Sequence, residues 1–373
     1  MPFYWIVLDG LILLGILAYV YRKRALSRVT YSRGFDRTTA FEGELVEMVE
    51  TIENRKLLPV PWLRLESLMP VALRFHRQSN LDIHAGEMFQ NHLSLFSLRP
   101  YRRIVRRHEI RCAKRGFYAL ESATMTAGEP LGLVQASRRF AMENLRLLVY
   151  PRLVPLREIP LPNHGWLGDL SVRRWIVEDP FLTAGIREYG PGDPLSRVHW
   201  KATARTGKLQ VQVKGHTADH RLVLCLNVEI NETMWKTVTD PERIEVGIRY
   251  AASIADDAIG RGMETGLLCN GWMLGEPKAP IRVEPAGGAV QLGALLTGLA
   301  KLQLESASNM AYLLEQEAER CPGRTDYLIL TCHREEKLAS AAERLRRMGN
   351  GVEWVIIPET GEKAGGDDHE REP

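Results

Sequence analysis

Hydrophobic and polar residues follow three different patterns along the chain, and each pattern predicts a different kind of structure. Residues 3–21 form one apolar run that contains a single charged side chain. Residues 28–150 contain segments in which apolar and polar positions alternate, such as 45–52, which is typical of strands with one buried face. From residue 221, short apolar runs alternate with stripes of helical spacing. We therefore expect an apolar helix, a β domain and an α/β domain, in this order.

The first segment, residues 1–24, is predicted to be a transmembrane anchor, because crossing a bilayer takes about 20 apolar residues. Its eleven Leu, Ile, Val and Phe residues favour insertion by about 3–7 kcal/mol. The single charge, Asp9, costs at most about 3.5 kcal/mol. A signal peptide would have its basic residues before the apolar run, whereas here Arg22, Lys23 and Arg24 follow it. The positive-inside rule then places the rest of the chain in the cytoplasm. The alternative interpretation is a buried core helix.

Residues 28–150 are predicted to fold as an antiparallel β-sandwich, with prolines at turn positions. Within them, residues 99–115 carry eight Lys or Arg side chains. We favour a solvated face of an edge hairpin for this segment, because apolar residues are interleaved with the basic ones. The alternative is a face that binds anionic lipids or cell-wall precursors. No nucleic acid is expected, because the formal net charge is only +3 and a second basic patch is missing.

Residues 151–220 are predicted to be a linker followed by a segment of unusual composition. Between 187 and 214 a Pro-Gly-Asp-Pro turn at 191–194 precedes a dense group of large polar and aromatic side chains. If this group lies on a strand, His199 and Lys201 share one face and Trp200 lies on the other. The candidate interaction residues are Arg187, Tyr189, Gly192, Asp193, Arg197, His199, Trp200, Lys201 and Arg205.

Residues 221–358 are predicted to form a doubly wound parallel sheet, because strand-like and helix-like patterns alternate. Residues 272–284 are predicted to be a β-hairpin insertion with a turn at Gly275. Residues 359–373 are predicted to be a disordered tail. The predicted strands are 222–228, 264–270, 326–332 and 352–357, and the predicted helices are 241–263, 288–304, 309–320 and 335–348.

The ordered signature within residues 187–214 resembles that of a bacterial family known as domain of unknown function 58. This resemblance implies a von Willebrand A-like fold for the α/β domain. It also implies a MoxR-type AAA ATPase as partner, and a membrane-bound transglutaminase-like protein as a second one. In von Willebrand A domains an Asp-x-Ser-x-Ser loop after the first strand binds a divalent cation. The corresponding residues here are Asn227, Glu229 and Asn231, and Thr331-Cys332-His333 follows the later strand. These side chains are too bulky for a compact magnesium site, so no metal cofactor is expected. The alternative is a magnesium ion to which Glu229 and Asn231 contribute oxygen ligands.

The combined pattern predicts a non-enzymatic adaptor that is anchored in the cell membrane. Five unpatterned cysteines are typical of a protein in a reducing compartment, which agrees with a cytoplasmic position. Arg and Trp residues of the signature are the types enriched at binding hot spots. The alternative from another class is a hydrolase or transferase that uses His199, Asp193 and a nearby cysteine.

Overall fold

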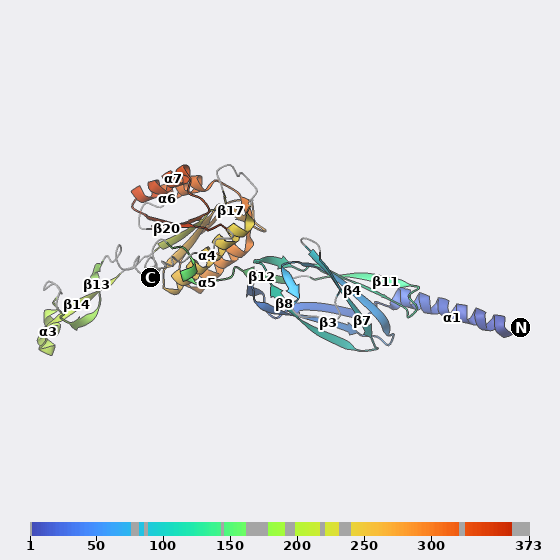
Figure 1. Ribbon diagram of the computed structural model, residues 1–373. Coiled ribbons are helices and arrows are strands. Elements are labelled where there is room, and N and C mark those ends of the chain that lie inside the picture. The colour runs from blue at the N-terminus through green and yellow to red at the C-terminus, as the bar shows by residue number, and fades with distance from the viewer. Residues whose placement is uncertain are drawn as a thin grey trace, which may run out of the picture. The chain divides into compact units, whose positions relative to one another are not determined.

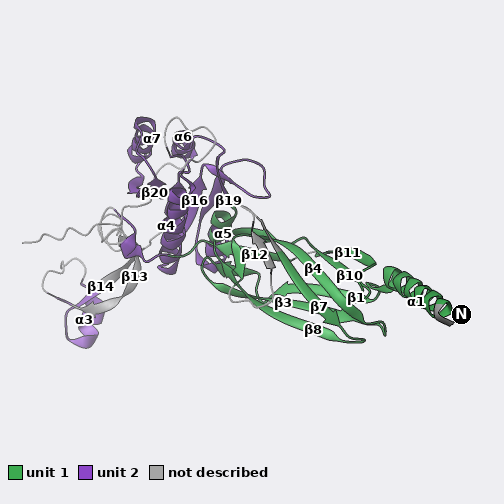
Figure 2. Cartoon of the chain, turned by 45° about the vertical axis from the view of Figure 1, so that its right-hand side comes forward, with its two compact units in different colours: residues 1–153, 296–302 green, residues 154–295, 303–373 purple. Residues whose placement is uncertain are grey.

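A computed structural model describes residues 2–75, 82–85, 89–142, 145–161, 178–190, 198–216, 221–230, 240–320 and 325–359. The chain divides into two compact units, which Figure 2 shows in different colours. The first unit consists of residues 1–153 and 296–302, and the second of residues 154–295 and 303–373. Each unit is described by itself.

The first unit begins with a single helix, α1 (Pro2–Arg24), which is the blue helix in Figure 1. Residues 4–24 of this helix are long and apolar enough to cross a membrane, and 6% of their most apolar window is buried. The last turn contains Arg22, Lys23 and Arg24. In length and composition, the helix agrees with the predicted anchor.

The β region that follows (residues 29–150) contains three sheets, in the strand orders β1-β3-β8-β5, β11-β10-β4-β7-β6 and β2-β12-β9. Its strands are β1 (Val29–Phe35), β2 (Thr39–Phe41), β3 (Leu45–Asn54), β4 (Val60–Pro70), β5 (Leu73–Phe75), β6 (Asp82–Ala85), β7 (Phe89–Leu98), β8 (Arg103–Cys112), β9 (Gly116–Ala119), β10 (Ser122–Gly128), β11 (Gln135–Ala141) and β12 (Arg146–Tyr150).

The two larger sheets of this region share one apolar core. Ile52 of β3 belongs to the same buried cluster as Leu63 and Leu65 of β4 and Met125 of β10. Every second residue of β3 is buried, as expected for a strand with one face toward a core. The expectation of purely antiparallel pairing is wrong at one place, because β2 and β12 pair in parallel. These strands lie far apart in sequence, so no hairpin forces them to run in opposite directions.

The second unit contains a five-stranded sheet in the order β18-β16-β15-β20-β21. Four of its strands are parallel, and β18 (Ile281–Ala286) is an antiparallel edge strand. The parallel strands are β15 (Arg221–Leu226), β16 (Glu264–Cys269), β20 (Thr325–Thr331) and β21 (Gly351–Ile356). The predicted α/β alternation is confirmed, with strand ends displaced by one or two residues.

Helices cover both faces of this sheet, as the alternation predicts. They are α4 (Pro241–Gly260) on one face and α6 (Met310–Arg320) and α7 (Glu336–Arg347) on the other. Helix α5 (Gly288–Lys301) follows β18, and its residues 296–301 belong to the first unit. Helices α6 and α7 share a core cluster with Cys225 and Ile329, and Figure 1 shows them on one side of β20. Helix α4 packs on the other face, where Gly247 lies against Leu226 and Ile357. A Cβ atom at Gly247 would come within 2.4 Å of Ile357, so this glycine permits the close approach.

The predicted hairpin at residues 272–284 is wrong. Strand β17 (Gly271–Met273) pairs with β19 (Leu302–Ser306), and β18 pairs with β16. The turn at Gly275 is present, with a positive φ of 89°. The strand after it bonds to the free edge of β16, which offers a longer ladder than the three residues of β17.

Candidate functional site

The carboxyl edge of the parallel sheet is the first candidate site. The chain passes from β15 to β16 on one side and later returns to β20 on the other side of β15. This change of direction lies between the carboxyl ends of β15 and β20, and open parallel sheets bind ligands at such a position. Asn227 follows β15 directly, Thr331 ends β20, and Asn270 follows β16.

These three side chains form one buried hydrogen-bond network. Asn270 donates from its amide nitrogen to Oδ1 of Asn227 at 2.8 Å, and Asn227 donates to Oγ1 of Thr331 at 3.2 Å. The Thr331 hydroxyl donates to the carbonyl of His333 at 2.9 Å. Oδ1 of Asn270 accepts the backbone N–H of Val228 at 2.8 Å. Asn227, Asn270 and Thr331 are each at most 1% exposed, so the network is buried. Its side chains are uncharged and find their hydrogen-bond partners within the protein.

Glu229 is bonded to this network through its backbone and carries an acidic group. Its backbone N–H donates to Oδ1 of Asn227 at 3.0 Å. Its carboxylate accepts the N–H of Met310, at the start of α6, at 3.4 Å, and the Ser306 hydroxyl at 3.5 Å. Burial is the main cause that raises the pKa of Glu229; the Met310 hydrogen bond opposes it and the charge of Glu335 adds to it. Glu335 itself is paired with His333.

The residues at this edge do not fit a magnesium ion. Magnesium prefers compact oxygen ligands in octahedral geometry. Oδ1 of Asn227 already accepts two hydrogen bonds, and Oγ1 of Thr331 is engaged as donor and acceptor. Asn231 lies outside the described residues. Elsewhere in the described ranges, His, Cys, Asp and Glu side chains form no group of three that could hold a metal.

The signature segment is the second candidate site, and its described part differs from the expected strand. His199 is the N-cap of a short helix, α3 (Trp200–Thr206), and its Nδ1 accepts the N–H of Ala202 at 3.0 Å. Gly207 ends the helix in a left-handed conformation with φ of 70°. The prediction that His199 and Lys201 share a strand face is therefore wrong. The segment after His199 contains good helix formers, among them Ala202 and Ala204, and the His199 side chain caps them. These local preferences produce a helix here, and the alternation typical of a strand begins only at Leu209.

The expected strand after the glycine is present as β14 (Gln210–His216), which pairs with β13 (Glu178–Glu188). Helix α3 is tied to this pair because His199 N–H donates to Gln210 O at 2.8 Å. Tyr189 follows β13, and its N–H donates to Leu209 O at 2.9 Å. The backbone of Arg187 lies in β13 opposite Val211. Gly192, Asp193 and Arg197 lie outside the described residues.

Helix α3 presents one aromatic and two basic side chains to solvent. Trp200 is 68% exposed, and Lys201 and Arg205 are exposed beside it in sequence. The described cysteines are poor candidates for a nucleophile, because all four are buried. Burial raises the pKa of Cys112 and of Cys332 to about 11.

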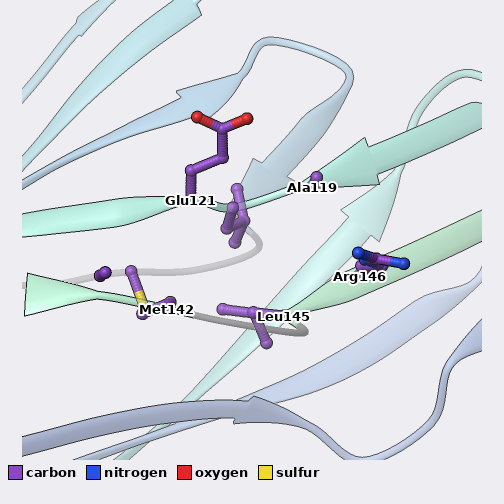
Figure 3. A pocket seen from close by; sticks show the side chains of 7 residues that line it. Ala119, Glu121, Met142, Leu145 and Arg146 are labelled. Carbon is purple, nitrogen blue, oxygen red and sulfur yellow. The ribbon is translucent and has the colours of Figure 1, made fainter.

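A cavity of about 440 Å³ in the first unit is a weaker candidate. Apolar atoms of Leu120, Met142 and Leu145 line it, together with Glu121 and Arg146. Figure 3 shows that the Glu121 carboxylate and the Arg146 guanidinium point away from each other. The two charges do not converge on one point, as groups that fix the orientation of a small ligand would.

Reasoning from the sequence identified Asn227, Glu229 and Thr331 but missed Asn270 and Arg243. Arg243 of α4 donates to the carbonyl of Cys332 at 2.8 Å and to that of Ile357 at 2.7 Å. It thereby joins the carboxyl ends of β20 and β21. Asn270 could have been found, because it directly follows a predicted parallel strand. Arg243 could not, because nothing in its helix indicates which carbonyls it reaches.

Comparisons with known proteins agree with the resemblance seen in the signature. Residues 185–353 match a family model described as "Protein of unknown function DUF58". The chain is also similar to the uncharacterized protein YeaD of Bacillus subtilis (strain 168), with 21% identity over 332 residues, 87% of this chain and 75% of that protein.

Several solved structures are similar to about a third of the chain. They include the CARDB domain of a Pyrococcus furiosus protein in complex with di-metal ions, at 16% identity and a TM-score of 0.20, covering 32% of this chain and 91% of that one. A cohesin module from a Clostridium perfringens family 33 glycoside hydrolase shares 10% identity, with a TM-score of 0.22 and coverage of 33% and 98%. These TM-scores are too low to support an argument about function.

Proposed function

We propose that this protein is a membrane-anchored, non-enzymatic adaptor that binds a partner protein through the carboxyl edge of its parallel sheet. The main support is the neutral network of Asn227, Asn270 and Thr331 at the carboxyl edge, where such sheets bind ligands. A ligand at this edge would meet the Glu229 carboxylate and the surrounding backbone instead of a metal ion. The family resemblance implies that the second unit is von Willebrand A-like.

Helix α3 is proposed as a second contact surface for the same partner. An exposed Trp side chain followed by Lys and Arg has the composition of a binding hot spot. His199, the first candidate for acid–base chemistry, uses Nδ1 to cap α3, which favours a structural role for its ring. The family resemblance further implies that the partner is a MoxR-type AAA ATPase, with a transglutaminase-like membrane protein in the same assembly.

Helix α1 is proposed to anchor the adaptor as a single span, with both units in the cytoplasm. Arg22, Lys23 and Arg24 at its carboxyl end support this orientation through the positive-inside rule. The anchor would confine the partner's activity to the membrane surface.

Co-purification of the full-length chain with the MoxR-type ATPase of the same genome tests the proposal. Glu229→Ala and Trp200→Ala should each reduce the ATPase retained by tenfold or more, about 1.4 kcal/mol. The matched control is Glu315→Ala, because Glu315 is an exposed carboxylate on α6. As a control for folding, all variants must have the same thermal unfolding temperature as the wild type. Full retention by both variants would contradict the proposed surfaces, and magnesium binding by the isolated chain would contradict the absence of a cation site.

A further inference from the structure

One end of the β region gathers the carboxyl end of α1 and three loops. We call it the helix-side end, and it consists of residues 22–28, 53–59, 98–103 and 129–134. The strand registers place these segments together, because Asn54 lies opposite Val29 and Arg103 opposite Glu53, and because Gly128 lies opposite Trp62 and Val60 opposite Leu98. Figure 1 shows α1 leaving the β region at this end.

Direct contacts hold α1 to the helix-side end. The Tyr21 hydroxyl donates to the Pro59 carbonyl at 3.2 Å, and the Lys56 ammonium donates to the Ala25 carbonyl at 2.8 Å. Tyr21 is 4% exposed and belongs to the core cluster of the β region, against which Leu17 also packs. The last turns of α1 are therefore part of the folded unit.

The length of α1 then places the helix-side end at the bilayer surface. The apolar stretch from residue 4 to residue 21 is about 27 Å long at 1.5 Å per residue. The hydrocarbon core of a bilayer is about 30 Å thick. A spanning helix needs this whole stretch, so residues packed beside Tyr21 must lie at the depth of the lipid headgroups. Residues packed beside Leu17 lie about 6 Å deeper, at the edge of the hydrocarbon core.

Large apolar side chains are exposed on the loops of this end. Leu57, Tyr101, Leu131 and Leu133 are each 63–74% exposed. At the opposite end, residues 36–44, which include β2, have no exposed large hydrophobic side chain, and Leu45 beside them is 44% exposed. Isolated exposed apolar residues are common, but a group on neighbouring loops at one end marks an interaction surface.

The loop at residues 129–134 holds its leucines outward in a fixed conformation. The buried Glu129 carboxylate accepts the N–H of Gly132 at 2.7 Å and of Val134 at 2.8 Å. The Trp62 indole donates to the Glu129 carbonyl at 2.8 Å. Gly132 has a φ of +75°, which favours glycine. Because the backbone is fixed in this way, Leu131 and Leu133 are preorganised for insertion into an apolar layer.

The helix-side end is strongly basic. Its four segments contain nine Lys or Arg residues and two acidic ones, whereas residues 36–44 contain one Arg and three acidic residues. Of the two acidic residues, Glu129 is buried and Glu53 is paired with Arg55 and Arg103. Basic clusters beside a membrane span attract anionic lipids, and tyrosine is enriched at the membrane interface.

We propose that the helix-side end is a docking surface for the anionic bilayer in which α1 is anchored. Leu57, Tyr101, Leu131 and Leu133 enter the interface, and the surrounding arginines contact anionic headgroups. This inference depends on the proposed anchoring by α1. It adds a second attachment, which fixes the β region against the membrane instead of leaving it on a single helix.

Depth measurements on the full-length chain in vesicles test this proposal. Leu131→Cys and Tyr101→Cys are labelled with a polarity-sensitive fluorophore, and Thr38→Cys in the opposite loop is the matched control. The unsubstituted chain, labelled in the same way, gives the background from the native cysteines. In vesicles that contain phosphatidylglycerol, labels at 131 and 101 should shift to the blue and be quenched by shallow spin-labelled lipid. The label at 38 should show neither effect.

A charge variant tests the basic part of the surface. Arg99→Gln combined with Arg102→Gln should reduce the quenching at position 101 severalfold, as should replacement of phosphatidylglycerol by phosphatidylcholine. Arg37→Gln at the opposite end should leave it unchanged. Equal quenching in all of these samples would overturn the role of anionic lipid.

Alkaline extraction separates failure of this proposal from failure of the anchor. If the chain is extracted, α1 does not span the membrane, and both the anchoring and the docking surface are wrong. If the chain resists extraction but position 131 remains water-exposed, only the docking surface is wrong. A label that is shielded from water but not quenched by lipid would mean that protein covers this end, which also overturns the proposal.

Discussion

His108 Nε2 lies 2.9 Å from Oε2 of Glu50 inside the β region, where the exposed fractions of the two residues are 3% and 0%. The guanidinium of Arg33 and the hydroxyl of Tyr31 contact the other oxygen of the same carboxylate. Burial would raise the pKa of Glu50, but the hydrogen bond from His108 and the charge of Arg33 outweigh it and hold this pKa far below its ordinary value. The β region therefore folds around a charged carboxylate.

A second histidine near this cluster makes the stability of the β region depend on pH. His92 is fully buried and stacks on Phe75 with ring centroids 4.7 Å apart. Within the described structure neither of its ring nitrogens has a hydrogen-bond partner. Burial lowers the pKa of His92 to about 4, from an ordinary 6.5; the Glu50 charge opposes this shift, and Arg33, His108 and Arg106 add to it.

Because the folded pKa is lowered, the unfolded chain takes up the proton first as pH falls. The free energy of unfolding should therefore fall between pH 6.5 and pH 4, by about 3 kcal/mol in total. Amide hydrogen exchange in β7 and β8, corrected for intrinsic rates, measures this loss locally. His92→Gln has no titrating ring and should lack this part of the pH dependence. An unchanged pH dependence in the variant would contradict the role of His92.

The Asn network at the sheet edge predicts a second, local effect on stability. Asn270→Ala removes the donor to Asn227 and the acceptor of the Val228 N–H. Each buried group left unpaired costs about 1–3 kcal/mol, so unfolding of the second unit should become easier by about 2–4 kcal/mol. Asn270→Asp keeps the acceptor but places a carboxylate beside Oδ1 of Asn227, and should be at least as damaging. Chemical denaturation, monitored by hydrogen exchange in β15 and β16, measures the stability of both variants. Wild-type stability of both variants would show that the network is not structural.

The sequence predicted the elements of the second unit well, because continuous apolar runs and helical stripes are strong local signals. The buried Glu50 was missed, although the alternation contains it: Val46, Met48 and Ile52 lie on the same face of β3. Its partners Tyr31 and Arg33 come from β1 and His108 comes from β8, and nothing local indicates that they meet. The strand predicted at His199 was wrong because one capping side chain and a terminal glycine decided the structure. The periodicity of hydrophobic residues does not indicate such tertiary and capping contacts.

Helix α3 gives a third prediction, which separates a structural from a catalytic role of His199. Removing an N-cap costs about 1 kcal/mol, so His199→Ala should increase hydrogen exchange in residues 202–207 by about fivefold. His199→Asn should largely restore protection, because Asn caps helices well but does not titrate near neutral pH. A catalytic or binding role of the imidazole would instead leave His199→Asn as defective in function as His199→Ala. Equal protection in wild type and His199→Ala would contradict the capping role.

Arg115 provides the last prediction, because its buried guanidinium binds the end of α5 within the first unit. Nη1 donates to the carbonyls of Leu299 at 2.7 Å, Leu302 at 3.0 Å and Ala300 at 3.2 Å. A cation at a helix carboxyl end is stabilised by the helix dipole, and no further turn of helix supplies N–H donors to these carbonyls. Arg115→Ala would leave several of them buried without a donor, at a cost of about 3 kcal/mol or more.

The comparison of Arg115→Ala, Arg115→Lys and Lys114→Ala identifies the cause of this loss. Lysine keeps the charge but cannot reproduce the planar fork of donors, so Arg115→Lys should recover only part of the stability. Lys114 is the exposed neighbour, and its loss should change the free energy of unfolding by less than about 0.5 kcal/mol. Thermal unfolding gives the totals, and hydrogen exchange in residues 296–302 locates the effect. If Arg115→Ala and Lys114→Ala show the same thermal unfolding and the same hydrogen exchange, the carbonyls at the end of α5 do not depend on the guanidinium. Water or another donor would then replace it without cost.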